Sequence, residues 1–196
     1  MGDQSSDEKR LSLAYLDLTE IPSNIGQKQL DIIEVLDISN NKFSDFRFLK
    51  TFPSLHTLIL DGNNVQSHTK FPPMPKLHTL WLNKNKVSNL TIFVDTLVKN
   101  FPKLQYLSMM NNPAAPSYFN GGTFQQFVDY RQFVISQIPG LEVLDDKKVT
   151  AEERYEAERV YKHKFRSSTK KKKRKSQSRD EIQIPMRASD SMDSSS

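Results

Sequence analysis

Apolar and polar residues follow one nine-residue pattern four times between residues 33 and 112. Leucine or another apolar residue stands at the first, fourth and sixth positions of each copy, and asparagine stands at the ninth. The residues at the fourth position are 22, 22 and 27 residues apart in successive copies. Self-similarity at such a period predicts a stack of similar structural units. The apolar triplets are Ile33, Leu36 and Ile38; Leu55, Leu58 and Leu60; Leu77, Leu80 and Leu82; and Leu104, Leu107 and Met109.

Each unit is predicted to contain one short strand, because alternate residues of a strand face the same side. A single unit cannot bury its own apolar face, so the units must stack and their strands must form a sheet. A proline two residues before a first leucine suits the start of a strand better than its middle. Such prolines are Pro53, Pro75, Pro102 and Pro139.

The ninth-position asparagines are predicted to be structural. A buried amide must be hydrogen-bonded, and asparagine has both donors and an acceptor with which to pair with backbone groups of the neighbouring units. We therefore expect a ladder of one asparagine per unit, formed by Asn41, Asn63, Asn85 and Asn112.

The two ends of the array depart from the pattern. A weaker copy precedes the four, with Leu16 where asparagine is expected, and atypical end units suit a stack that meets water. In the 27-residue step, residues 91–99 suit a helix on the convex side. Residues 124–138 show the three-and-four spacing of an amphipathic helix, and residues 138–145 suit a last strand-like turn. Thr150 and Glu153 form a predicted capping box that starts a second helix.

The motif from Tyr130 to Arg154 resembles the C-terminal cap of the SDS22-like leucine-rich repeat family, whose 22-residue repeat also matches. The resemblance implies an α/β leucine-rich repeat solenoid of about five repeats, with a curved parallel sheet and a helical cap. We predict a disordered N-terminus over residues 1–10, repeats over 11–112, the cap over 113–165 and a disordered basic, serine-rich tail over 166–196.

The family resemblance also implies a function. Its members include phosphatase regulatory subunits, a dynein light chain and spliceosomal proteins. A short five-repeat chain with a cap and a basic tail is similar to members that act as adaptors in pigment-cell differentiation. That similarity makes a Rab-type small GTPase of melanosome traffic a candidate partner. The alternative implied by the family is a nuclear or spliceosomal scaffold.

The concave face of the predicted sheet is the expected binding surface. Residues between the core leucines point away from the core, and neighbouring strands lie about 4.8 Å apart, so Ile59, Trp81 and Tyr106 should form one patch. Contiguous apolar patches mark contact sites, and Trp and Tyr are frequent hot-spot residues. The alternative is that Trp81 is covered. The two exposed columns are Val35, Thr57, Thr79 and Tyr106, and Asp37, Ile59, Trp81 and Ser108.

All of the net positive charge lies in the tail. Residues 166–196 hold nine basic and four acidic side chains, whereas the remainder of the chain is neutral overall. The repeats therefore give no electrostatic reason to expect nucleic acid. The basic run could be an import signal, a contact for anionic lipid or a solubilising extension, and residues 182–186 could dock a second partner. The run is Lys170, Lys171, Lys172, Lys173, Arg174 and Lys175.

The chain has no cysteine and no apolar segment near the ~20 residues of a membrane span. Its start lacks the apolar core of a signal peptide, although Met1-Gly2 with Ser6 fits the loose myristoylation pattern. We expect an intracellular monomer, cytoplasmic or on vesicles.

No catalytic motif, phosphate-binding glycine loop or small-molecule substrate is indicated, and no cofactor is expected. His56 and His78 occupy equivalent positions beside Glu34 and Gln105, which could hold zinc in principle. A solvated histidine pair is favoured, because no third strong ligand is evident.

Overall fold

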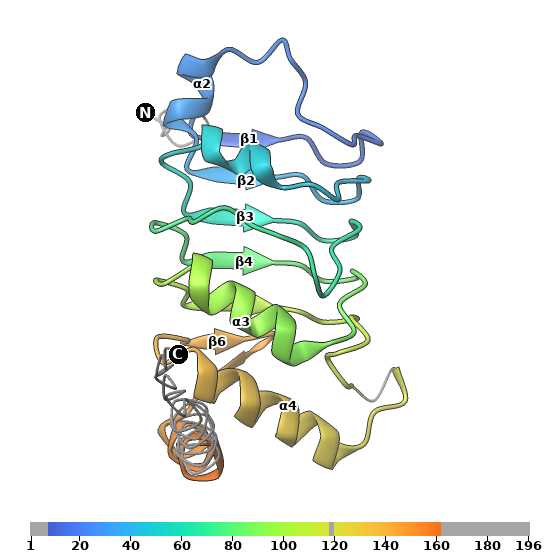
Figure 1. The fold of residues 1–196 in the computed structure, drawn as a ribbon, viewed down its shortest axis with the longest axis vertical. Coiled ribbons are helices and arrows are strands. Elements are labelled where there is room, and N and C mark those ends of the chain that lie inside the picture. The colour runs from blue at the N-terminus through green and yellow to red at the C-terminus, as the bar shows by residue number, and fades with distance from the viewer. Residues whose placement is uncertain (1–7, 118–119, 162–196) are drawn as a thin grey trace, which may run out of the picture.

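The computed structural model describes residues 8–117 and 120–161 as one continuous seven-stranded sheet with helices against one of its faces (Figure 1). The strands lie in chain order, which is the arrangement that a stack of repeats requires. Their bounds are β1 Arg10–Ser12, β2 Val35–Asp37, β3 Thr57–Ile59, β4 Thr79–Trp81, β5 Tyr106–Ser108, β6 Val143–Leu144 and β7 Lys147–Lys148.

The fourth-position leucines lie side by side along the centre of the sheet. Leu36 of β2 pairs with Leu58 of β3, which pairs with Leu80 of β4 and then with Leu107 of β5. All four side chains are buried. The predicted parallel solenoid and its register are therefore confirmed, and the 27-residue step keeps the same register as the 22-residue steps.

Each predicted proline lies in a turn at the start of its strand. The fourth and last residue of the turn donates its backbone N–H to the carbonyl of the first, as Leu77 does to Met74 at 3.2 Å and Leu104 to Phe101 at 3.1 Å. Proline suits the second position of such a turn because its φ is already fixed near the required value. Leu55 and Leu141 make the corresponding bonds.

The asparagine ladder is present at all four predicted positions. The side-chain amide of Asn85 donates to the carbonyls of Leu60 at 3.0 Å and Leu82 at 3.0 Å, and its oxygen accepts the backbone N–H of Val65 at 2.9 Å. Each asparagine thus joins its own repeat to the preceding one. Equivalent bonds are made by Asn41, Asn63 and Asn112.

The first repeat is held by the second. Leu16 is exposed although the ladder asparagines at the equivalent position are buried, and its backbone N–H donates to the side chain of Asn41, as does that of Leu18. The helix α2, Gln27–Ile32, lies beside this repeat, and the sequence pattern did not predict it.

Helices and buried phenylalanines fill the convex side. The predicted helix in the longest step is α3, Leu90–Asn100, which begins at the N-cap Asn89 and buries Phe93, Val94 and Leu97. The short 3-10 helix η1, Arg47–Thr51, covers the second repeat. Phe71 contacts Phe46, Phe93 and Phe101, with ring centroids 5.0 to 6.4 Å apart. The aromatic rings thus link neighbouring repeats.

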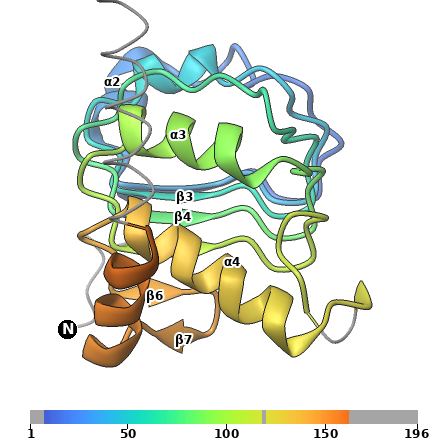
Figure 2. The same cartoon turned by 60° about the horizontal axis from the view of Figure 1, so that its bottom comes forward.

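The cap closes the C-terminal end of the sheet (Figure 2). It consists of α4, Phe124–Gln137, the strands β6 and β7, and a helix over residues 151–161. Both helices begin at capping boxes, Thr123 with Gln126 and the predicted Thr150 with Glu153. The strand β7 is antiparallel to β6 and was not predicted, because a two-residue exposed strand has no apolar alternation.

Candidate functional site

The candidate site is the sheet face away from α3, here called the concave face and made by the exposed positions of β2 to β5. Ile59 pairs with Trp81 across β3 and β4, and Thr79 pairs with Tyr106 across β4 and β5. Trp81 and Tyr106 are therefore diagonal neighbours, within reach of each other's large side chains. The exposed fraction is 46% for Trp81 and 37% for Tyr106. The indole of Trp81 is not covered by any described segment.

A polar row beside Tyr106 fixes the edge of this patch. The Tyr106 hydroxyl donates to Glu142 at 3.1 Å, and the Gln105 amide donates to the other oxygen of the same carboxylate at 3.1 Å. The hydrogen bond from Tyr106 to Glu142, together with the charge of that carboxylate, raises the pKa of the Tyr106 phenol. The ring of Tyr106 is thus oriented by a residue of the cap.

A partly buried hydrogen-bond chain runs along the other side of Trp81. The carboxylate of Asp61 accepts the backbone and side-chain N–H groups of Asn83 at 2.8 and 3.1 Å, and the Ser108 hydroxyl donates to the Asn83 amide oxygen at 2.6 Å. Burial raises the pKa of Asp61 against the effect of these bonds, and the nearby charge of Asp37 raises it further.

The expected exposure of Ser108 is wrong. Its side chain is buried, because a small hydroxyl at this position turns to the Asn83 amide instead of to solvent. Val35, Asp37, Thr57, Ile59 and Thr79 are half-buried, as expected of a column of neighbours on a sheet face. Asp37 also lies 3.6 Å from the Arg10 guanidinium of the first repeat.

The two histidines form a stacked pair at the amino ends of the strands. The ring centroids of His56 and His78 are 4.7 Å apart and the planes differ by 14°. His56 Nε2 lies 3.4 Å from Glu34, whose pKa is lowered chiefly by the hydrogen bond from Lys9. Burial and the charge of His56 lower the pKa of His78. Within residues 8–117 and 120–161, no three metal-ligating side chains converge on one point.

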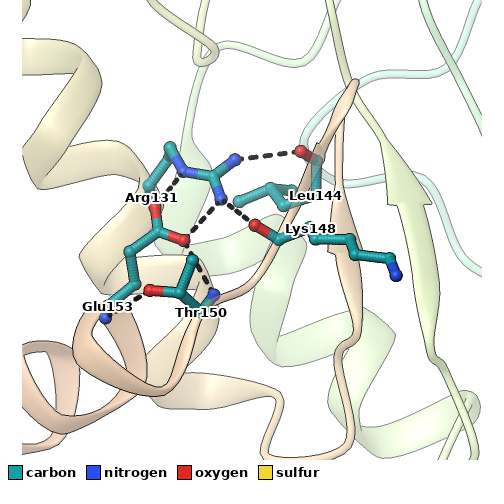
Figure 3. Close-up of polar contacts among 5 residues, drawn as sticks. All are labelled: Arg131, Leu144, Lys148, Thr150 and Glu153. Atoms are coloured by element: carbon teal, nitrogen blue, oxygen red, sulfur yellow. Dashed lines mark hydrogen bonds and ion pairs between the residues drawn. The ribbon is translucent and has the colours of Figure 1, made fainter.

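An ion pair inside the cap holds β6 and β7 against the helices (Figure 3). The buried Arg131 guanidinium donates to both oxygens of Glu153, at 2.7 and 3.1 Å, and to the carbonyl of Leu144 at 2.9 Å. Burial alone would raise the pKa of Glu153, but the bonds from Arg131 and from the Thr150 backbone outweigh it, so this pKa is lowered. One carboxylate thus caps a helix and neutralises a buried cation.

The basic run, the N-terminal acylation pattern and residues 182–186 lie outside the described part of the chain. Among the described residues, no helix has the length and apolar character needed to cross a bilayer.

A leucine-rich repeat family model matches residues 8–174, which includes all of the described sheet and cap. The chain belongs to the leucine-rich repeat family. The family match agrees with the register of the strands and with the asparagine ladder.

Two curated relatives of this leucine-rich repeat chain come from different settings. It is 36% identical over 152 residues to the human leucine-rich melanocyte differentiation-associated protein, covering 76% of this chain and 66% of that protein. It is 31% identical over 152 residues to the U2 small nuclear ribonucleoprotein A' of Candida albicans, covering 77% of this chain and 60% of that one. The matches with its curated relatives thus span about half to two thirds of those relatives' lengths.

A solved structure shares the fold. The chain superposes on one in the crystal structure of the Drosophila melanogaster SNF/U2A' complex with a TM-score of 0.64 and 23% identity, covering 83% of this chain and 87% of that one. The likeness shows the same leucine-rich repeat architecture.

Proposed function

We propose that this leucine-rich repeat protein is a non-catalytic adaptor that binds one protein partner on its concave face. The observation that carries the proposal is the row Ile59, Trp81 and Tyr106 on three adjacent strands. The repeats beneath it are tied together by the asparagine ladder, so the row is held before any partner arrives. A preformed surface loses less conformational entropy on binding than a flexible one.

The patch has a recognisable chemistry. Two aromatic rings and an isoleucine form its centre, and the carboxylates of Asp37, Asp61 and Glu142 lie around it. Apolar centres with polar rims are typical of protein interfaces. We propose that the partner presents an apolar side chain flanked by basic ones.

The likeness to the human melanocyte protein supports a role in pigment-cell differentiation, and a Rab-type small GTPase of melanosome traffic is the first candidate partner. The proposed site of action is the cytoplasm, including melanosome-related vesicles. The proposed SDS22-like subfamily agrees with the 22-residue period and the cap motif.

The proposal is tested by affinity capture with the full chain carrying Trp81→Ala and Tyr106→Ala together. The matched control removes two equally exposed apolar side chains from α3, Ile92→Ala with Val98→Ala. We expect the concave variant to bind its partners at least about tenfold more weakly, as loss of hot-spot residues does, and the control to bind normally. Equal binding by both variants would move the site elsewhere.

The GTPase assignment has a separate test. Purified protein should capture melanosome-type Rab proteins in their GTP-bound state and not in their GDP-bound state. Capture of neither state would exclude this class of partner. The concave face itself would come into question only if the first experiment also failed.

A second candidate function is a nuclear ribonucleoprotein scaffold. It is favoured by the three U2 A' relatives and by the likeness to the U2A' chain of the SNF/U2A' complex. Imaging separates the two functions. Nuclear accumulation that is abolished by replacing Lys170–Lys175 with glutamines would favour the scaffold, and a cytosolic or vesicular signal would favour the adaptor.

A further inference from the structure

A second surface lies between the last repeats and the cap. It is a groove of about 550 Å³ at the carboxyl ends of β5 and β6. Met110, Pro116, Phe124 and Phe127 supply apolar lining, and the β6–β7 turn, residues 145–146, lies at its edge with Lys147 of β7. Met110 and the turn directly follow the strands of the concave face, so the groove adjoins that face but does not include Trp81 or Tyr106.

The capping box at the start of α4 fixes the backbone that carries the two phenylalanines of this groove. Phe124 is the first residue of α4 and 80% exposed, although the capping box of Thr123 and Gln126 orders the helix start around it. Phe127 lies with the Lys147 ammonium 5.4 Å and the Arg131 guanidinium 5.8 Å from its ring centre. Met110 is 40% exposed. Large apolar side chains gathered around one hollow indicate a docking surface.

We propose that this groove binds a segment of the same chain, Ile182–Met186. The segment places Ile182, Ile184 and Met186 at alternate positions, which in an extended chain brings the three apolar side chains to one side. Pro185 favours the extended conformation for the residue before it. A short extended ligand with apolar residues on one side matches a groove lined by methionine, proline and phenylalanine.

The intervening chain is long enough. Residues 162–181 join the last described helix to the segment, and 20 residues reach up to about 66 Å when extended. This reach exceeds the roughly 30 Å diameter of a 150-residue domain, whose radius of gyration is about 15 Å. The tether raises the effective concentration of the segment to the millimolar range, so weak contacts are sufficient.

The charges are complementary. The cap, residues 113–161, carries eight acidic and five basic side chains, a net charge of −3. The linker, residues 162–181, carries ten basic and two acidic side chains, a net charge of +8. Asp146 at the groove edge is exposed, and the two acidic residues just before Ile182 can meet the exposed Lys147. The basic linker is therefore attracted to the domain that carries the groove.

The absence of cysteine permits a direct test on the full chain. A single Ser189→Cys substitution carries a nitroxide label, and paramagnetic broadening is measured on every backbone amide of the ¹⁵N-labelled protein. We expect the amides of residues 110–111 and 122–127 to lose most of their intensity and those of β1, at the far end of the sheet, to keep theirs. When nitroxide-labelled protein without ¹⁵N is mixed with ¹⁵N-labelled protein without a nitroxide, we expect no broadening, because the docking is within one chain.

Matched variants separate apolar docking from charge attraction. Ile184→Asp should abolish the broadening, whereas Gln183→Asp adds the same charge one residue away and should leave it. Phe124→Ser should abolish it and Tyr155→Ser, an exposed aromatic on the helix over residues 151–161, should not. The proposal is overturned by broadening that is absent from the groove, equal in both tail variants, centred on Ile59 and Trp81, or present in the mixed sample.

Discussion

Asn63 and Asn64 are neighbours in sequence but have different environments. The amide of Asn63 donates to the carbonyls of Ile38 at 2.9 Å and Leu60 at 3.1 Å and accepts from Phe43, all inside the stack. The side chain of Asn64 accepts from the Lys86 ammonium at 2.7 Å near the surface. Position within the repeat, and not residue type, decides which asparagine stabilises the fold.

The first residue-scale prediction compares these two side chains. Asn63→Ala should lower the free energy of unfolding by about 1–3 kcal/mol, because buried backbone groups lose their hydrogen-bond partner. Asn64→Ala should change it by about 0.5 kcal/mol or less, as surface substitutions do. Urea denaturation followed by tryptophan fluorescence measures both. Equal midpoints for the two variants would contradict the structural role of the ladder.

At the scale of elements, the cap depends on Arg131 and Glu153. The arginine lies in α4 and the glutamate in the helix over residues 151–161, and the bonds to β6 bring both helices and a strand to one guanidinium. Because the arginine is buried and the glutamate only partly so, removing the glutamate leaves a buried charge without its partner.

Glu153→Gln should therefore destabilise the protein by about 2–3 kcal/mol, somewhat below the roughly 3–5 kcal/mol of a fully buried pair. A double variant, Arg131→Met with Glu153→Met, should recover part of the loss because no lone charge remains. Denaturant midpoints measure both. If the loss of stability in the double variant equals the sum of the losses in Arg131→Met alone and Glu153→Met alone, the two residues are not coupled.

The same pair predicts a pH dependence. The pKa of Glu153 is lowered in the folded state, so its stabilising effect is complete above the unfolded value near 4.3 and is lost as the pH falls through the folded value. The difference in stability between the natural chain and Glu153→Gln should be constant near neutral pH and shrink below about pH 4. Denaturation at several pH values checks this, and a constant difference down to pH 3 would contradict it.

Elements also show how far the sequence pattern reaches. The strands β2 to β5, α3, α4 and the capping box of Thr150 and Glu153 could be predicted, because each depends on a local period or on residues three apart. The burial of Ser108 and the bond from Tyr106 to Glu142 depend on neighbours 25 and 36 residues away. The roles of Arg131 and of the groove at Phe124 likewise require the cap to be assembled first. No local pattern carries that information.

At the scale of the whole molecule, each repeat contacts only its neighbours. The inner repeats are covered on two sides, but among residues 8–117 and 120–161 the first has a neighbouring repeat on one side only, and its Leu11, Leu18 and Ile21 are only partly buried. It also lacks its own ladder asparagine and relies on Asn41. Stability in such a stack is a sum of unit and interface contributions, so it should be lowest at a poorly covered end.

We therefore expect amide hydrogens of β1 and residues 13–18 to exchange faster than those of β3 and β4. Hydrogen-exchange mass spectrometry at neutral pH measures this on the full chain, and local opening free energies should rise toward the middle repeats. Uniform protection across all repeats would instead show that the chain unfolds as a single unit.

The longest repeat has a practical consequence for engineering. Five more residues than in a 22-residue step are accommodated by α3, yet Thr79 still pairs with Tyr106 and Leu80 with Leu107. The helical side of the arc thus tolerates added length while the opposite side stays in phase. A fluorescent reporter attached to an exposed side-chain position of α3, such as Val98, would alter a surface that the proposed partner does not touch, which makes this helix the natural place to build a sensor.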